Sequence, residues 1–262
     1  MPLTGKTTYQ YTSMDKWSAP PRPNTYAEKM LISAILDGSF SPGDTLPGER
    51  TLAHELGITR PTLREAIQRL ARDGWLTVRQ GKPTVVNDFW REGGLNVLNT
   101  LVHHGGELPP GFVTHLLEVR LQLAPAYTKE AIAREPAAVA TFTAGHVSLG
   151  DDAPSFARFD WDLHHLLTVS SGNPIYTLIL NGFNEFYEEL ARIYFVPPAA
   201  RTRSRHFYAA LFDAANAQDS QRGEAICRET MADSIVVWHQ ARSAERYGGI
   251  KSFDKESYSE QN

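Results

Sequence analysis

Residues 49–73 carry the pattern of a short helix, a tight turn and a longer helix. Leu52 and Leu56 provide the apolar face of a helix expected over 49–56, which Gly57 ends. Thr59 is placed to cap a second helix, expected over 60–73, because its side chain can accept a free backbone N–H. The apolar stripe of that helix consists of Leu63, Ala66, Ile67 and Leu70. The pattern predicts a helix-turn-helix unit.

The first turn of the second helix carries the residue types that a DNA major groove requires. Thr59, Thr62 and two arginines occupy it, while the apolar stripe faces away. Arginine can form two parallel hydrogen bonds to a guanine edge, and free N–H groups at a helix start favour phosphate. The plain alternative is a surface helix with solvated arginines. A preceding helix, expected over 25–36, and a hairpin over 75–86 favour the DNA interpretation.

Charge is distributed unevenly along the chain. Residues 1–90 hold 11 basic and 9 acidic side chains, whereas residues 91–262 hold 15 and 21. Within residues 50–82 there are seven basic side chains against three acidic ones. This asymmetry indicates a polyanionic partner for the N-terminal part only.

Beyond Gly93 the sequence pattern is helical throughout. Amphipathic stretches are expected at 94–103, 111–133, 136–147, 154–170, 174–195, 199–217 and 220–243, with Pro125 kinking or splitting the second. The predicted fold is therefore mostly α: an N-terminal winged helix-turn-helix domain (α/β) over 24–88, followed by a C-terminal all-α helical bundle of six or seven helices over 89–244. Residues 1–23 are expected to form a disordered lead and 245–262 a flexible tail.

Composition excludes several other classes of protein. The single cysteine, Cys227, cannot support a disulfide framework or a cysteine-rich zinc site within one chain, and it favours a reducing cytoplasm. No apolar run is long enough for a membrane span, and residues 1–20 lack the apolar stretch of a secretory signal. There is no phosphate-binding glycine loop, and Ser170 follows no predicted strand, so no nucleophile elbow is present. We therefore predict a cytoplasmic protein that is not an enzyme.

Three segments resemble the winged-helix domain of GntR-type bacterial transcription regulators. They are Leu46-Pro-Gly-Glu-Arg-Thr-Leu-Ala53, Thr59-Arg-Pro-Thr-Leu-Arg-Glu-Ala66 and Arg69-Leu-Ala-Arg-Asp-Gly-Trp-Leu76. Further segments resemble the branch of this family that regulates fatty acid metabolism: Gln80-Gly-Lys-Pro83, Asn87-Asp-Phe-Trp90, Ser171-Gly-Asn-Pro-Ile-Tyr176, Leu178-Ile-Leu-Asn-Gly182 and Tyr194-Phe195. The resemblance covers residues 24–243.

The resemblance implies a set of DNA-contacting positions. They are Arg50, Thr59, Arg60, Thr62 and Arg64, with Gln80 and Gly81 at the tip of the wing. From the hairpin pattern alone, Lys82 is expected at the same tip, where it could contact the DNA backbone or the minor groove. Two positions depart from the family pattern, which usually has threonine at Pro61 and histidine at Gln80. Pro61 removes a hydroxyl and an N–H, so a phosphate contact is expected to be lost, and the operator sequence is expected to differ from the family consensus.

The helical body carries polar residues on otherwise apolar helices: Arg120, Tyr194, Tyr208, Arg228, Ser234 and Trp238. From the residues alone, a pocket for an anionic, partly apolar ligand competes with the simpler reading that the aromatic side chains are core. The resemblance implies that these positions lie at or near a site for long-chain fatty acyl-CoA. Met231 and Asp233 replace a family glycine and glutamate, which puts the chain-length preference in question.

Asp160 and His164 suggest a different kind of site, one that binds a metal. They are four residues apart on one helix face, which is a metal-ligand spacing. Many GntR relatives bind a metal through such a pair and two later histidines, but those later positions hold Tyr208 and Thr230 here. A hydrogen-bonded pair in the bundle core is the expected role, and no metal or other cofactor is predicted. A regulator that senses a small carboxylate through a bound metal remains the alternative.

The resemblance and the residues together predict a ligand-responsive transcription regulator. One recognition helix covers few base pairs, so we expect a homodimer on a double-stranded, pseudo-palindromic operator. The resemblance implies a repressor of fatty acid degradation genes that is also an activator of unsaturated fatty acid synthesis genes, released from its operator by long-chain acyl-CoA.

Overall fold

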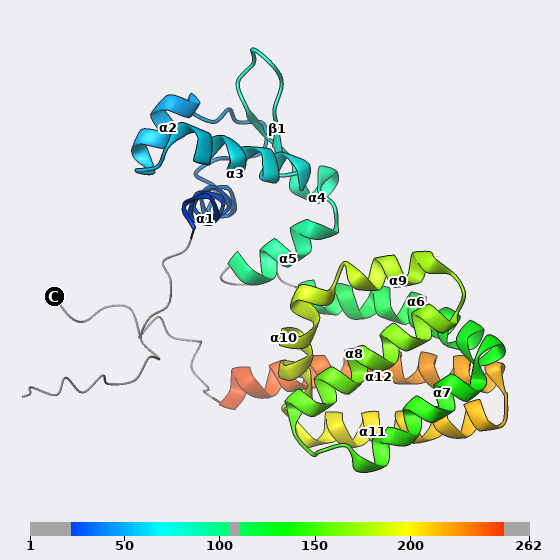
Figure 1. Cartoon of the computed structure of the whole chain (residues 1–262). Coiled ribbons are helices and arrows are strands. Elements are labelled where there is room, and N and C mark those ends of the chain that lie inside the picture. Colours follow the sequence, from blue (N-terminus) through cyan, green and yellow to red (C-terminus); the bar gives the residue numbers. More distant parts are fainter. Residues whose placement is uncertain (1–21, 105–110, 249–262) are drawn as a thin grey trace, which may run out of the picture. The chain divides into compact units, whose positions relative to one another are not determined.

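The computed structural model describes residues 22–104 and 111–248 (Figure 1). Contacts within the chain divide it into two compact units, with the division between Val97 and Leu98. The first unit combines helices with one small sheet, and the described part of the second is helical. The predicted fold class is confirmed. None of the helices in the described ranges is long and apolar enough to cross a membrane.

The N-terminal unit is a winged helix-turn-helix. Its elements are α1 (Pro23–Leu36), α2 (Glu49–Glu55), α3 (Arg60–Arg72), β1 (Leu76–Thr77), β2 (Val85–Val86) and α4 (Phe89–Glu92). The two strands are antiparallel, with Leu76 opposite Val86. Helix α3 packs on both α1 and α2, and its predicted apolar stripe is buried, together with Trp75. The strands are shorter than the predicted hairpin arms.

The recognition helix α3 begins and ends as its sequence predicts. The Thr59 hydroxyl oxygen accepts the backbone N–H of Thr62 at 3.4 Å, and Pro61 lies in the first turn. At the other end Gly74 has a φ of +92°, and a Cβ there would lie 2.7 Å from the Cα of Gly93. Only glycine fits both conditions. Gly74 therefore ends α3 and admits the close approach of the segment after α4.

Residues 89–97 pack with the N-terminal unit. The ring of Phe89 in α4 lies 4.6 Å from the ring of Trp75, and the Asn96 amide donates to Asp73 at 3.1 Å. These contacts explain why the division falls within α5 (Leu95–His104), whereas the sequence predicted a boundary at residue 88. Helix α4 itself was not predicted.

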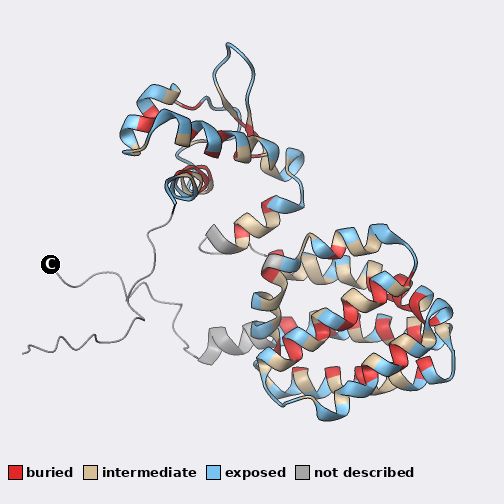
Figure 2. Ribbon diagram, in the orientation of Figure 1, coloured by how far each residue is buried: buried red, intermediate tan, exposed pale blue. Residues whose placement is uncertain are grey.

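The C-terminal unit is a bundle of long helices: α6 (Phe112–Arg134), α7 (Pro136–Thr143), α8 (Ala153–Ser170), α9 (Pro174–Asn181), α10 (Asn184–Phe195), α11 (Pro198–Asn216) and α12 (Ser220–Gly248). Helix α12 packs along α6, α8 packs against both α6 and α10, and α11 packs against α7 and α12. The buried positions on these helices face one another, and the exposed positions face outward (Figure 2).

The predicted helix 174–195 is wrong in extent. It is two helices, because the chain turns at Gly182 and Phe183, where the Phe183 N–H donates to the Leu180 carbonyl, three residues back, at 2.9 Å. At Pro125 the sequence predicted a kink or a split, and no split occurs, since α6 runs without a break from Phe112 to Arg134. The predicted helix 136–147 also ends as a 3-10 turn over Ala144–Ser148. The break between α9 and α10 matters because residues on both sides of it line a cavity.

Candidate functional site

The exposed face of the N-terminal unit collects the residues predicted to contact DNA. Arg50 on α2 and the first turn of α3 are exposed or half-buried, as is the loop that joins β1 to β2. At the tip of that loop Gly81 has a φ of +67°, which a glycine adopts without strain. The surface is formed by Arg50, Thr59, Arg60, Thr62, Arg64, Gln80, Gly81 and Lys82.

Glu49 at the start of α2 organises the arginines of α3. Its carboxylate accepts two hydrogen bonds from Arg64, Nε to Oε1 at 3.1 Å and Nη2 to Oε2 at 2.6 Å. Arg60 lies further off, with Nη2 3.9 Å from the same Oε2. The hydrogen bonds from Arg64 hold the pKa of Glu49 below its ordinary value. The orientation of Arg64 is therefore fixed by a bidentate ion pair, whereas Arg60 is only loosely held.

Other basic residues in this unit are engaged elsewhere. Arg69 pairs with Glu28 at 3.3 Å and with Glu65 at 2.6 Å. By contrast, Arg50, Arg79 and Lys82 form no ion pair with any residue in the ranges that the structure describes. Arg50 and Lys82, two of the predicted DNA residues, are thus available to a polyanion, as is the exposed Lys29 on α1.

The C-terminal unit contains a mainly apolar cavity of about 110 Å³ between α6, α8, α9 and α10. Its apolar wall comprises Val113, Leu116, Leu117, Val119, Leu123, Ile179, Leu180, Phe183, Phe186, Leu190, Ala191 and Phe195. Its polar or aromatic lining consists of Arg120, Tyr127, Asp160, His164, Tyr176, Tyr187 and Tyr194. An apolar wall with a few convergent polar groups is the usual form of a small-molecule site.

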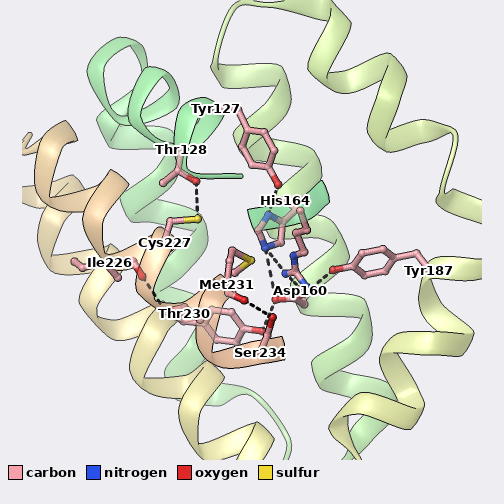
Figure 3. Close-up of polar contacts among 12 residues, drawn as sticks. Tyr127, Thr128, Asp160, His164, Tyr187, Ile226, Cys227, Thr230, Met231 and Ser234 are labelled. Carbon is pink, nitrogen blue, oxygen red and sulfur yellow. Dashed lines mark hydrogen bonds and ion pairs between the residues drawn. The ribbon is translucent and has the colours of Figure 1, made fainter. Parts of the chain in front are cut away.

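The polar part of the wall is centred on the carboxylate of Asp160, which is only 3% exposed (Figure 3). Arg120 donates to Asp160 at 2.6 Å, Tyr187 donates at 2.5 Å and Tyr208 donates at 3.0 Å. Burial alone would raise the pKa of Asp160, but Arg120, His164 and the hydrogen bonds lower it overall. Asp160 is therefore an ionised carboxylate that joins α6, α8, α10 and α11.

His164 lies one turn after Asp160 and belongs to the same cluster. Its Nε2 is 2.5 Å from Arg120 Nη2, and its Nδ1 is 2.6 Å from the Tyr127 hydroxyl oxygen. Burial and the neighbouring Arg120 guanidinium lower the pKa of His164 to about 3. The imidazole is therefore neutral near pH 7.

The Asp160 and His164 side chains, which have the spacing of metal ligands, both contact Arg120. Asp160 and His164 approach within 3.8 Å, but Arg120 bonds to both of them. Within the described ranges no three His, Cys, Asp or Glu side chains are grouped as metal ligands, and Tyr208 donates to Asp160. The donor set therefore does not fit the metal-sensing alternative.

The predicted ligand residues divide into two groups. Arg120 and Tyr194 line the cavity, and Tyr208 reaches its wall through Asp160. Ser234, Trp238 and Arg228 on α12 are not part of the lining. Ser234 is buried and donates to the Met231 carbonyl at 2.6 Å, Trp238 is buried, and Arg228 is exposed and pairs with Glu224 at 3.0 Å.

Sequence reasoning did not identify Tyr127 and Tyr187 as lining residues. Both are tyrosines on helix faces that are otherwise apolar, which is also the pattern of ordinary core aromatics. Cys227, which we expected to be a packing residue, is fully buried beside Thr128, and burial raises its pKa to about 12. A thiol in that state is not an activated nucleophile.

The exposed helix α3, the wing beside it and a second, helical unit are the parts of a winged helix-turn-helix transcription regulator. The gntR family of bacterial regulatory proteins matches residues 25–86, and the FadR C-terminal domain family matches residues 87–245. The chain belongs to the GntR family.

The relatives agree with this assignment. The fatty acid metabolism regulator protein of Shewanella denitrificans is 42% identical over 220 residues, covering 84% of this chain and 92% of that one. The protein of the same name from Shewanella amazonensis is 40% identical over 222 residues, covering 85% and 92%. The solved structure of Lar, which controls expression of the Listeria monocytogenes agr system, has a TM-score of 0.53 at 15% identity, covering 85% of this chain and 99% of that one, and supports the fold alone. This chain is a transcription regulator of fatty acid metabolism, not an enzyme.

Proposed function

We propose that long-chain fatty acyl-CoA is the effector of this regulator and that its binding releases operator DNA. The observation that carries the proposal is the mainly apolar cavity, which lies within the part of the chain that matches the FadR C-terminal domain. An acyl chain supplies the apolar surface that such a wall buries, and the more polar CoA portion would remain nearer the surface of the unit.

The polar side chains around Asp160 connect the cavity to the positions of several helices. Arg120, Asp160 and Tyr187 belong to three different helices and all line the cavity. A ligand that fills the cavity contacts all three side chains, so any change in their mutual bonds would act on three helices at once. Since a packed unit has few alternative arrangements, the change is expected as a shift of whole helices.

On DNA we propose that Arg60 and Arg64 read base edges in the major groove, while Thr59 and Thr62 hold phosphate. The exposed first turn of α3 supports these roles. Arg50 is exposed on α2, which packs against α3, and carries no ion pair within the described ranges, so we assign it to phosphate as well. Gln80, Gly81 and Lys82 at the tip of the wing would contact the DNA backbone or the minor groove.

We further propose that the chain acts as a homodimer in the cytoplasm, where its operator is found. Two copies of α3 would read the two halves of a pseudo-palindromic site. Genes of fatty acid degradation would be repressed, and genes of unsaturated fatty acid synthesis activated. Rising acyl-CoA would then relieve repression when fatty acids are abundant.

A gel-shift assay tests this proposal. The full chain is titrated onto a fatty-acid-regulator operator duplex and onto a scrambled duplex, with no ligand, with oleoyl-CoA and with butyryl-CoA. We expect preference for the operator and release by oleoyl-CoA alone. Equal binding to both duplexes would refute the DNA roles, and an operator complex that is indifferent to oleoyl-CoA would refute the effector.

A further inference from the structure

The hydrogen-bond chain at the polar end of the cavity has a fixed direction. Arginine carries only donors, so the Arg120 guanidinium donates to His164 Nε2, which must be an unprotonated acceptor. A neutral imidazole then carries its single proton on Nδ1. That N–H donates to the Tyr127 hydroxyl oxygen, 2.6 Å away (Figure 3). The reverse direction would place two donors against each other at Arg120.

Tyr127 is consequently left with an unused donor. Its hydroxyl oxygen receives the His164 proton, and its own O–H has no acceptor among the residues that the structure describes. The side chain is only 5% exposed and lines the cavity. A buried O–H group without an acceptor is costly, and a ligand oxygen in the cavity would satisfy it.

The neighbouring polar groups leave no excess charge for an anion. The positive charge of Arg120 is matched by Asp160 at 2.6 Å, and the remaining hydrogen bonds to that carboxylate come from the neutral side chains Tyr187 and Tyr208. The cluster around Tyr127 is therefore neutral overall. A carboxylate placed there would lose its hydration without gaining a cation of its own.

We propose that the Tyr127 hydroxyl donates a hydrogen bond to a neutral oxygen carried by an aliphatic ligand in this cavity. This rests on the proposed function only in taking that ligand to be an acyl-CoA. The oxygen has two possible sources: the thioester carbonyl that every acyl-CoA carries, or a hydroxyl or keto oxygen further along the acyl chain. Both present the same acceptor to Tyr127.

The first experiment uses a small ketone, whose carbonyl oxygen can only accept a hydrogen bond and which has no CoA portion. Titration calorimetry measures the binding of 2-octanone to the full chain and to the variants Tyr127→Phe and Thr128→Val. Thr128 is the matched control, because it is the next residue on α6, is buried and loses a hydroxyl group, but does not line the cavity. We expect Tyr127→Phe to weaken binding roughly three- to tenfold, as for one neutral hydrogen bond, and Thr128→Val to leave it unchanged. An equal effect in both variants, or none in Tyr127→Phe, overturns the proposal.

A second measurement does not depend on a variant that folds. The carbonyl carbon of ¹³C-labelled 2-octanone is observed by NMR in the presence of the wild-type chain. A hydrogen-bond donor shifts this resonance downfield from its position in a hydrocarbon solvent. We expect the bound ketone to show that shift, and a bound resonance at the hydrocarbon position overturns the proposal.

Acyl-CoA ligands then separate the two sources of oxygen. Hexadecanoyl-CoA and 3-oxohexadecanoyl-CoA are titrated into the wild type and into Tyr127→Phe. If Tyr127→Phe weakens the binding of both ligands equally, the thioester carbonyl is the acceptor. If it weakens only the binding of 3-oxohexadecanoyl-CoA, the keto oxygen of the acyl chain is the acceptor. Failure of any acyl-CoA to release operator DNA, with the ketone results intact, refutes the proposed effector and leaves the Tyr127 assignment standing.

Discussion

Arg64 lies on the carboxylate of Glu49 in a bidentate pair, with Nη2 2.6 Å from Oε2, while Arg60 stays 3.9 Å from the same oxygen. One acidic residue of α2 thus constrains one of the two arginines that we propose to read base edges far more than the other. Fixing a guanidinium in one orientation reduces the entropy lost when it meets a base edge. It also places a negative charge close to the expected path of the phosphates.

The variant Glu49→Gln should therefore bind DNA more tightly and less selectively. Removing the carboxylate frees Arg64 for phosphate, so we expect the slope of log affinity against log salt to steepen by up to about one unit. Discrimination between operator and scrambled duplex should fall severalfold. Glu65→Gln is the control, since Glu65 pairs with Arg69 rather than with Arg60 or Arg64. Unchanged discrimination in Glu49→Gln would show that the pair has no positioning role.

Asp160→Asn should destabilise the C-terminal unit strongly. The change leaves the Arg120 charge without its ionised partner in a site where Asp160 is 3% exposed. Removing one partner of a buried ion pair costs roughly 3–5 kcal/mol. Urea unfolding of the full chain, followed by circular dichroism, measures the loss. Asp162→Asn, at an exposed position on the same helix, should change stability little, and equal effects would contradict the cluster's role.

Stability of the same unit should decrease as the pH falls below neutrality. The pKa of His164 in the folded chain is about 3, against an ordinary value of 6.5. Between these values the unfolded chain binds a proton that the folded chain does not, so acid favours unfolding, with a limiting slope of about 1.4 kcal/mol per pH unit. The lowered pKa of Asp160 acts in the same direction, because its stabilising contribution is lost as the pH falls through its folded pKa.

The variant His164→Gln isolates the contribution of the histidine. Glutamine can still accept from Arg120 but does not titrate, so the slope between pH 6.5 and about 4 should become shallower by roughly one proton. The adjacent His165→Gln serves as the control. A wild-type slope that persists in His164→Gln would assign the pH dependence to other groups.

Arg228→Ala should affect the CoA portion of the ligand and not the cavity. Arg228 is exposed on α12 and pairs only with Glu224 among the described residues, outside the cavity lining. If Arg228 contacts a CoA phosphate, the variant should weaken the binding of oleoyl-CoA severalfold and leave the binding of 2-octanone unchanged. Arg222→Ala, also exposed on α12, is the control. A loss of ketone binding in Arg228→Ala would mean that the substitution has altered the structure of the C-terminal unit and its cavity.

The recognition helix could be predicted closely because its signals are local. Thr59 caps α3, Pro61 sits in its first turn and Gly74 follows its end, so each boundary depends on neighbours within a few residues. The break between α9 and α10 has weaker signals. The apolar residues continue across Gly182, and the pattern alone did not distinguish one long helix from two.

The polar end of the cavity could not be assembled from the sequence. Arg120 and Asp160 are 40 positions apart, and Tyr208 lies a further 48 along the chain. Asp160 and His164 were recognised as a pair because they share one helix face. Arg120, which contacts both side chains and makes them a poor metal site, comes from another helix. The resemblance identified Arg120, Tyr194 and Tyr208, and only the fold shows that Tyr127 joins them through His164.

We propose that a ligand in the cavity and operator DNA oppose each other's binding. Titration calorimetry of oleoyl-CoA against the free full-length chain, and against the chain saturated with operator, measures this opposition. We expect the operator to weaken oleoyl-CoA binding by the same factor by which oleoyl-CoA weakens operator binding, about 5- to 150-fold for an ordinary coupling. Equal affinity of oleoyl-CoA for the free and the operator-bound chain would show that the two sites are not coupled.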